Sequence, residues 1–256
     1  MRIYIPTRNR INKQVTLSNI PDDWESRTYL VCSPEEAPVH EKLGRQVLIC
    51  PVSGIGNVRQ WLLENTSKYI LMLDDDQTFF KWKSPTDYHL ERCSNDEVSE
   101  LFNDIQAYLE TGEIFVGIAS RQGNNNMFPD SIKFNIRNCN SYGVNTEYLN
   151  KNNIVFNAIP VMEDFHVQLS LLTSGQRTIC ITDRVWNQVG SGADGGCSEY
   201  RTNELQTEAA QKLKDCFPDF VKLVTKNNKT GWKGMENRTD VIISWKKAYE
   251  FGRREL

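Results

Sequence analysis

Short apolar runs alternate with helix-length segments through the first half of the chain. The runs lie at residues 2–5, 28–32, 46–50, 69–73 and 114–119, and helical spacing of apolar residues marks 61–64 and 96–109. A short continuous apolar run predicts a strand buried on both faces, and strands separated by helices predict βαβ units. The expected fold class is therefore α/β, with a mostly parallel, Rossmann-like central sheet flanked by helices.

The second half of the chain is more polar. Asn-rich stretches at 123–126 and 138–141 bound a segment that predicts a small antiparallel element, residues 162–172 carry a helical apolar face, and 178–182 predict one more strand. A length of 256 residues suffices for one α/β domain with a small appendage. We expect a catalytic domain over residues 1–211 and a C-terminal extension over 212–256 that packs on the same domain.

Charge is distributed unevenly along the chain. Residues 212–256 hold eleven Lys and Arg against six Asp and Glu, a net of +5, so the total of −3 leaves −8 on residues 1–211. A basic tail is a candidate contact for a polyanion, although such charges also serve as a solvated helix face. The whole chain lacks the strongly basic balance of proteins that bind nucleic acid by charge alone.

The cysteines and the apolar pattern bear on the compartment. Seven cysteines are scattered and never form a Cys-x-x-Cys pair, which is typical of free thiols in a reducing compartment. The sequence opens with a predicted strand and shows neither a signal-peptide pattern nor a long apolar span. We therefore expect a cytoplasmic protein that does not associate with membranes.

Three consecutive aspartates, Asp74, Asp75 and Asp76, follow the apolar run 69–73 directly. Adjacent carboxylates repel one another, so the cluster is expected to surround a positive charge. In an extended segment Asp74 and Asp76 project to one side and Asp75 to the other, so the outer two are expected to share a Mg²⁺ or Mn²⁺ ion. Such an ion would neutralise a diphosphate leaving group. The alternative is a solvated acidic turn, and nucleotidyltransferases, nucleases and phosphatases also gather carboxylates at strand ends.

The order of these features resembles the nucleotide-binding half of GT-A glycosyltransferases. A first strand ends in Ile-Pro-Thr-Arg, a second ends near Glu35, a third precedes a glycine-containing loop with Asn57-x-Arg59, and a fourth ends in Asp-x-Asp. The resemblance implies a nucleotide-sugar-binding half at 1–80 and an acceptor half at 110–200. The donor contacts it implies are Pro6, Thr7, Arg8, Glu35, Arg59, Asp74 and Asp75, with Asp74 on the ribose and Asp76 and Asp74 at the metal. The alternatives are that Pro6 only shapes a loop and that Arg8 and Arg10 are surface charges.

An acidic pair, Glu163 and Asp164, opens the predicted helix 162–172. The same resemblance gives the pair the role of general base, because inverting GT-A enzymes use a carboxylate to take the proton from the acceptor hydroxyl. Asp164 is the first choice and Glu163 the second. Acids in a first helical turn also favour the helix dipole without any catalytic role. His166 is a candidate for contact with acceptor or metal, although a lone helical His is more often structural.

A glycine-rich segment at 190–196 follows Trp186-Asn187-Gln188. Its composition suits a lid that closes over the diphosphate, and it suits a surface loop equally well. Trp186 is a candidate acceptor contact at the start of this segment.

Several motifs together resemble the TET-associated glycosyltransferases encoded by bacteriophages. They are IPTRNR at 5–10, LDDDQ at 73–77, MEDFHVQLSLLTSG at 162–175 and KTGWK at 229–233. The resemblance implies transfer from a nucleotide sugar, first of all a UDP-sugar, to a hydroxymethylated base of phage DNA such as 5-hydroxymethylcytosine, in the host cytoplasm. It makes Lys229, Trp232 and Lys233 candidate DNA contacts, since lysines bind phosphates and an indole stacks on a base.

The sequence thus favours a metal-dependent, inverting glycosyltransferase, with three alternatives. The first is a GT-A enzyme that acts on a glycan, a small molecule or a protein. The second is a sugar nucleotidyltransferase, which would need a glycine-rich loop after the first strand, where residues 6–10 contain no glycine. The third is an inactive binding module, and the retained Asp-x-Asp speaks against it.

Overall fold

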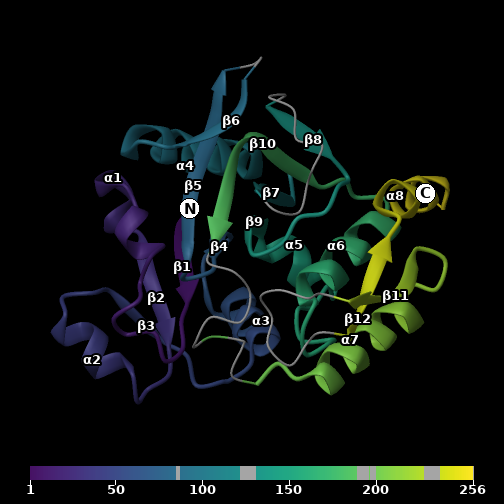
Figure 1. Cartoon of the computed structure of the whole chain (residues 1–256), viewed down its shortest axis with the longest axis horizontal. Helices are drawn as coiled ribbons and strands as arrows, with labels where there is room; N and C mark the ends of the chain where they lie inside the picture. Colours follow the sequence, from purple (N-terminus) through teal and green to yellow (C-terminus); the bar gives the residue numbers. More distant parts are fainter. Residues whose placement is uncertain (85–86, 122–130, 189–195, 197–199, 228–236, 256) are drawn as a thin grey trace.

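A ten-stranded sheet forms the centre of the molecule, with helices on both of its faces (Figure 1). The protein is seen in a computed structural model, which describes residues 1–84, 87–121, 131–188, 196, 200–227 and 237–255. The strands in spatial order are β3 (Val47–Ile49), β2 (Thr28–Cys32), β1 (Arg2–Pro6), β4 (Tyr69–Leu73), β9 (Ser141–Asn145), β7 (Phe115–Ser120), β10 (Ile179–Gln188), β5 (Gln77–Ser84) and β6 (Asp87–Arg92), with β8 (Ile132–Phe134) paired to β10.

The described strands run mostly in one direction. β1, β2, β3 and β4 pair in parallel, and β7 and β10 pair in parallel. β9 is antiparallel to both β4 and β7, so β7 runs in the same direction as β4. β5 is antiparallel to β10 and β6 is antiparallel to β5, so β6 also runs in the direction of β4. Within the ten described strands of the central sheet, β5, β8 and β9 therefore run against the other seven. The predicted α/β class with a mostly parallel central sheet is confirmed, and β8 and β9 lie where an antiparallel element was expected.

The central strands are buried on both faces, as their continuous apolar runs predict. Alternate residues of β1 and β4 point to opposite sides because side chains alternate along a strand. Ile3, Ile5, Leu71 and Leu73 join one apolar cluster, and Tyr4, Ile70 and Met72 join the other. The first cluster is covered by α4 (Asn95–Glu110) through Leu101, Phe102 and Ile105, and the second by α3 (Ile55–Asn65) through Leu62 and Leu63.

Helix α4 begins where the sequence indicates. The Ser94 side chain accepts a hydrogen bond from the Glu97 N–H at 3.3 Å, and the Glu97 carboxylate accepts one from the Ser94 N–H at 2.9 Å. This reciprocal pair is a capping box, which satisfies two backbone donors at the helix start. The other helices of the first part are the 3₁₀ turn Leu17–Asn19, α1 (Asp22–Glu25), α2 (Ala37–Lys42), α5 (Thr146–Lys151) and α6 (Glu163–Thr173).

Four elements follow the central sheet and form a C-terminal module. They are α7 (Asn203–Cys216), the antiparallel pair β11 (Val221–Asn227) and β12 (Asn237–Ile243), and α8 (Trp245–Arg254). Helix α8 lies against α6, where the ring of Trp245 meets the edge of Phe165 at 5.6 Å between centroids. The division expected at residue 211 falls inside α7, which contacts β11 and β12 and so belongs with them.

Helix length and hydropathy bear on membrane insertion. Among the described residues, no helix combines the length and the apolar character needed to span a bilayer.

Candidate active site

A cavity of about 940 Å³ opens at the carboxyl ends of the parallel strands. Its walls come from the loops after β1, β2, β3 and β4 and from the first turns of α3 and α6. Loops that leave the same edge of a parallel sheet meet there, and open α/β sheets bind their ligands at this edge. The donor contacts expected from sequence all line this cavity: Pro6, Thr7, Arg8, Glu35, Arg59, Asp74 and Asp75.

The three aspartates after β4 form ion pairs with two arginines. Asp75 accepts a hydrogen bond from the Thr7 hydroxyl at 2.7 Å and from Arg10 at 2.6 Å. Asp76 lies 3.0 Å from the same nitrogen of Arg10, whereas Asp74 pairs with Arg59 at 2.9 Å. Arg10 is buried, so the interpretation of this residue as a surface charge is wrong. The positive charge expected within the acidic run is thus supplied by the chain itself.

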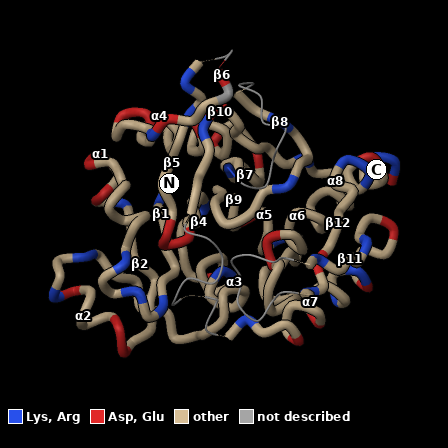
Figure 2. The backbone as a smooth tube through the Cα atoms, viewed as in Figure 1, with Lys and Arg blue, Asp and Glu red and all other residues tan. Residues whose placement is uncertain are grey.

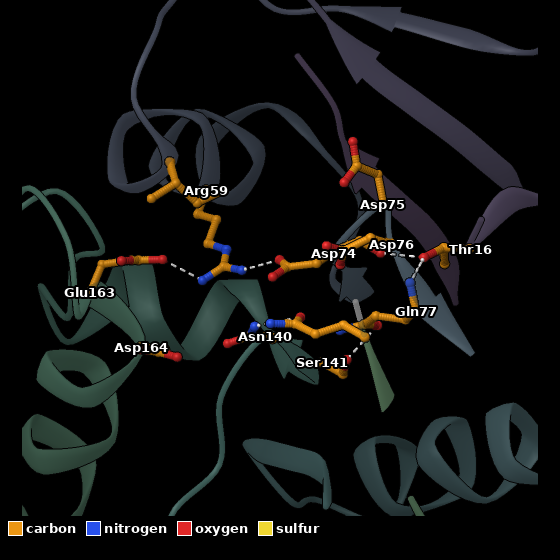
Figure 3. Close-up of polar contacts among 12 residues, drawn as sticks. Thr16, Arg59, Asp74, Asp75, Asp76, Gln77, Asn140, Ser141, Glu163 and Asp164 are labelled. Carbon is orange, nitrogen blue, oxygen red and sulfur yellow. Dashed lines mark hydrogen bonds and ion pairs between the residues drawn. The ribbon is translucent and has the colours of Figure 1, made fainter. Parts of the chain in front are cut away.

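The expected alternation along the acidic run is corrected by the structure. β4 ends at Leu73, and the next residues form a turn before β5 rather than continuing the strand. Side chains alternate only in extended backbone, and here Asp75 and Asp76 both pair with Arg10. Asp74 points toward Arg59 (Figure 3). The prediction that Asp74 and Asp76 share one side and Asp75 the other is therefore wrong.

Arg59 joins the acidic run to the start of α6. Its guanidinium is 2% exposed and lies between Asp74 and Glu163, with a hydrogen bond to each (Figure 3). A planar guanidinium presents several N–H donors in fixed directions, so it can hold two carboxylates at once. Arg59 lines the cavity as expected for a donor contact, but these two hydrogen bonds make it a positioning residue for the carboxylates.

Glu163 and Asp164 begin α6 after Met162, whose left-handed backbone (φ 65°) turns the chain into the helix. Both carboxylates are buried in the cavity wall. Burial, together with the charge of Glu163, raises the pKa of Asp164 to about 6, although Arg59 and Arg137 oppose the shift. Asp164 accepts a hydrogen bond from the Phe165 N–H at 2.9 Å. A carboxylate with a pKa near 6 is suited to take up a proton at neutral pH.

A divalent cation would find two suitable carboxylates in this cavity. Asp75 is committed to Thr7 and Arg10 and its side chain is only 6% exposed, whereas Asp74 and Asp76 are 29% and 16% exposed. Within the described ranges no group of three or more His, Cys, Asp and Glu is arranged to hold a metal ion. Carboxylates are the ligands that Mg²⁺ prefers in nucleotide sites, where substrate phosphates and water complete the shell. Asp74 and Asp76 pair with different arginines, so a shared ion would have to replace at least one of these pairs, and their role as metal ligands stays a prediction.

Of the two described residues expected from the sequence to contact the acceptor, one lines the cavity and one does not. Trp186 lines the cavity, and its indole N–H donates to the Ile118 carbonyl at 2.9 Å, which fixes the ring against the sheet. His166 is not among the lining residues; its ring packs on Phe217 at 5.5 Å, because it lies on the side of α6 that faces the C-terminal module. Burial lowers the pKa of His166, as expected for a neutral structural His.

Two sets of predictions lie outside the described residues. Lys229, Trp232 and Lys233 fall within residues 228–236, and most of the glycine-rich segment falls within 189–195. Gly196 is described, and its N–H donates to the Arg8 carbonyl at 3.0 Å. The Tyr200 hydroxyl accepts a hydrogen bond from the Ile55 N–H at 3.0 Å, so this part of the chain meets the cavity wall at the start of α3.

Several lining residues were not singled out from the sequence. Arg137 and Asn140 come from the loop between β8 and β9, and Lys226, Arg238 and Asp240 come from the C-terminal hairpin. The Asn-rich stretch 138–141 marked a loop, and the positive φ of Asn140 (66°) agrees with that composition. Nothing in the sequence pattern indicated that β11 and β12 reach the same cavity as the acidic run.

Comparison with known proteins yields one family and several distant folds. A family model described as TET-Associated Glycosyltransferase matches residues 1–196. Among curated proteins, none matches the sequence significantly. Of solved structures, S. aureus TarS is 14% identical with a TM-score of 0.48, over 84% of this chain but 40% of the TarS chain.

Two further structures are similar at the same distant level. Mannose-1-phosphate geranyltransferase from Thermus thermophilus is 10% identical with a TM-score of 0.42, over 72% of this chain and 75% of that one. The inositol-1-phosphate CTP transferase from T. maritima is 10% identical with a TM-score of 0.44, over 84% of this chain and 96% of that one.

Proposed function

The chain belongs to the family of TET-associated glycosyltransferases, and from this premise we propose the reaction that its cavity performs. The sugar of a nucleotide diphosphate donor, most simply a UDP-sugar, is transferred to the hydroxyl of a hydroxymethylated base in DNA. The observation that carries the proposal is the convergence of Asp74, Glu163 and Asp164 around Arg59 in one cavity. The residues proposed to bind the donor and the residues proposed to activate the acceptor thus lie in the same cavity.

The donor side of the proposed reaction lies on the ends of β1, β2 and β4. Arg10 lies beside Asp75 and Asp76, Arg8 lines the same cavity, and their guanidinium groups favour the negative charge of a diphosphate. A Mg²⁺ or Mn²⁺ ion bound by Asp74 and Asp76 would supply further neutralisation of the leaving diphosphate. Asp75 is buried on Thr7 and Arg10, so its part is to hold the loop in place.

The acceptor side depends on the carboxylates of α6. Asp164 accepts the proton of the acceptor hydroxyl while that oxygen attacks the anomeric carbon, and the bond between the sugar and the diphosphate breaks. Direct displacement of this kind inverts the anomeric configuration. Glu163 is tied to Arg59 by a hydrogen bond, which leaves Asp164 as the better placed base. A base hydroxyl in a duplex is reached either at the groove edge or after the nucleotide is turned out of the stack.

Nucleoside mass measurement tests the proposed transfer. The purified protein is incubated with Mn²⁺, a panel of nucleotide sugars and DNA with either hydroxymethylated or plain bases, and the DNA is then digested to nucleosides. One donor is expected to add the mass of one sugar to the hydroxymethylated nucleoside alone. Transfer to a glycan, a protein or a small molecule in place of DNA would refute the acceptor, and consumption of a sugar phosphate with a nucleoside triphosphate would indicate a nucleotidyltransferase.

The metal site is tested by Asp76→Asn. The variant is expected to lose most of its transfer activity at low Mn²⁺ and to require far more Mn²⁺ for half-maximal rate, because one of two charged ligands is gone. Asp219→Asn is the matched control, since Asp219 is exposed and lies outside the cavity lining. An Asp76→Asn enzyme with the wild-type rate and an unchanged Mn²⁺ requirement would rule out this carboxylate as a ligand.

A further inference from the structure

The C-terminal module forms one wall of the catalytic cavity. Its elements, from α7 onward, lie beyond residues 1–196, which are the part matched by the family model. The module is fixed beside the catalytic carboxylates because α8 packs on α6. Gly252 of α8 lies so close to the backbone of Leu172 and Gly175 that a side-chain carbon would overlap both. At the other end of α6, the Trp245 ring at the start of α8 packs on Phe165, the residue after Asp164. The hairpin β11–β12, which directly precedes α8, is therefore held near Glu163 and Asp164.

Four cationic side chains gather on this wall. They are Arg137 from the loop before β9, Arg201 before α7, Lys226 on β11 and Arg238 on β12, and all line the cavity together with the carboxylate of Asp240. We name these five residues the cationic wall. Figure 2 shows Lys and Arg in blue along β11, β12 and α8, interspersed with acidic residues in red. Among the described lining residues, this wall holds four cations and one carboxylate, whereas five carboxylates lie at the end of β4 and the start of α6.

Asp240 holds two of these cations in place. Its carboxylate lies 3.0 Å from the Lys226 ammonium on the neighbouring strand β11 and 3.3 Å from the Arg238 guanidinium on its own strand β12. Lys226 is exposed at the cavity and its side chain retains 44% of its surface, so Asp240 positions the ammonium without covering it. The one negative charge of Asp240 holds the two positive charges of Lys226 and Arg238 in place. These three groups together carry a charge of +1, which favours binding of an anion.

Arg137 connects the cationic wall to the proposed base. Its guanidinium lies over the ring of Phe165 at 5.1 Å, next to Asp164 in the chain. Cys139, Asp164 and Asp240 together raise the pKa of Arg137, so this arginine interacts electrostatically with both the proposed base and the hairpin carboxylate. An anion bound on the wall would therefore lie beside the atom that accepts the acceptor proton.

We propose that the cationic wall binds a backbone phosphate of the acceptor strand and so holds the modified nucleotide beside Asp164. This inference rests on the proposed DNA acceptor. Guanidinium and ammonium groups arranged together are the usual partners of phosphate oxygens, and phosphate contacts set the register of a protein on DNA. The donor diphosphate has the same chemistry, but its expected place is the opposite wall with Arg8 and Arg10.

Binding of a labelled single-stranded oligonucleotide with one hydroxymethylated base tests the proposal. Lys226→Gln is expected to weaken binding about three- to tenfold, as loss of one charge-assisted contact does, and to lower the slope of log affinity against log salt by about 0.7. Lys222→Gln is the matched control, since Lys222 lies on the same strand, is exposed and does not line the cavity. Its oligonucleotide affinity is expected to equal that of the wild type.

A second variant changes binding in the opposite direction. Asp240→Asn removes the negative charge of the wall and keeps a side chain that can accept hydrogen bonds, so oligonucleotide affinity and salt slope are both expected to rise. Uridine diphosphate, measured by calorimetry with the same proteins, distinguishes the two sources of phosphate. Its affinity is expected to be the same in wild type and Lys226→Gln.

Three outcomes would overturn the proposal. They are unchanged oligonucleotide binding in Lys226→Gln, an equal loss in Lys222→Gln, and a loss of uridine diphosphate affinity with oligonucleotide binding intact. Failure of the proposed function is seen separately, in the wild-type transfer assay. A wild-type protein that binds DNA through Lys226 but transfers no sugar would keep the phosphate site and remove the reaction.

Discussion

Arg59 holds two carboxylates that come from distant parts of the chain, Asp74 after β4 and Glu163 at the start of α6. Its planar guanidinium presents N–H donors in fixed directions, so the two hydrogen bonds hold these two chain segments together. The triad therefore fixes the distance between the proposed donor side and acceptor side of the cavity. In this arrangement Asp164 is left with a backbone N–H as its hydrogen-bond partner and with a pKa raised to about 6.

The pH dependence of transfer follows from Asp164. A general base works when deprotonated, so kcat/KM is expected to fall about tenfold per pH unit below the pKa of about 6. Because the charge of Glu163 contributes to that raised pKa, Glu163→Gln should move the acidic limb of the pH–rate profile to lower pH. Profiles of both enzymes between about pH 4.5 and 8 would show this. A limb that stays in place or moves upward in Glu163→Gln would contradict the assignment of the base.

Asp74 is expected to cost stability at neutral pH. Burial raises its pKa to about 7 against the opposing effect of Arg59, whereas an unfolded Asp has a pKa of about 3.9. A folded-state pKa above the unfolded value means that stability is lost as the pH rises from about 4 through about 7. Asp74→Asn should therefore match the wild-type Tm near pH 4 and exceed it increasingly up to about pH 8, as thermal unfolding would show.

Asp219→Asn provides the comparison for that measurement, because this exposed residue lies outside the cavity lining. A gain in Tm of equal size in both variants, or a gain for Asp74→Asn that is largest at low pH, would show that the Asp74 carboxyl is not destabilised by burial.

At the level of residues, the sequence predicted the acidic part of the site better than the basic part. Asp74, Asp75, Asp76, Glu163 and Asp164 all line the cavity, since strand ends and helix starts are recognisable from the apolar pattern. The positions of the arginines in the cavity cannot be recognised from the apolar pattern in this way. Whether Arg10 is buried among carboxylates or exposed depends on how the loop after β1 folds over the next strands, which local sequence does not specify.

At the level of elements, α8 is tied to α6 by a contact that allows no side chain. Gly252→Ala would place a methyl carbon against the backbone of Leu172, Thr173 and Gly175, so α8 would have to move away from α6. We expect a clear loss of Tm, despite the higher helix propensity of Ala. Glu250→Ala, at an exposed position of the same helix, should leave Tm nearly unchanged. Similar Tm values for the two variants would mean that the helices tolerate separation.

The elements that sequence patterns missed are those that tertiary contacts decide. The parallel strands β1 to β4 and β7, the first part of β10 and helix α4 were predicted because their apolar residues form continuous runs or follow a helical period of 3.6. The hairpin β5–β6 (Gln77–Ser84 and Asp87–Arg92) was not, since its residues QTFFKWKS and DYHLER mix charges with aromatics. β5 exists as part of the sheet because it pairs with β10. Strands of this kind gain their conformation from a neighbour rather than from their own sequence.

At the level of the whole molecule, the cavity combines two parts of opposite charge. Residues 1–211 carry −8 and supply the five carboxylates at the end of β4 and the start of α6, and residues 212–256 carry +5 and supply Lys226, Arg238 and Asp240. The charge asymmetry was evident from the sequence and indicated a polyanion contact for the tail. The position of the tail beside the proposed catalytic carboxylates was not evident, because it depends on the packing of α8 on α6, two helices that are far apart in the sequence.

The central claim is that this cavity transfers a sugar to a base hydroxyl with Asp164 as the base. The most direct test is a time course of glycosylated nucleoside, measured by mass after digestion of hydroxymethylated DNA, with wild type and Asp164→Asn side by side at about pH 8, where the base is deprotonated. We predict a gain of one sugar mass with the wild type and a rate about 10²–10⁴-fold lower with the variant, at an unchanged affinity for uridine diphosphate. Equal rates in the two enzymes, or no gain in mass with the wild type for any nucleotide sugar, would contradict the account.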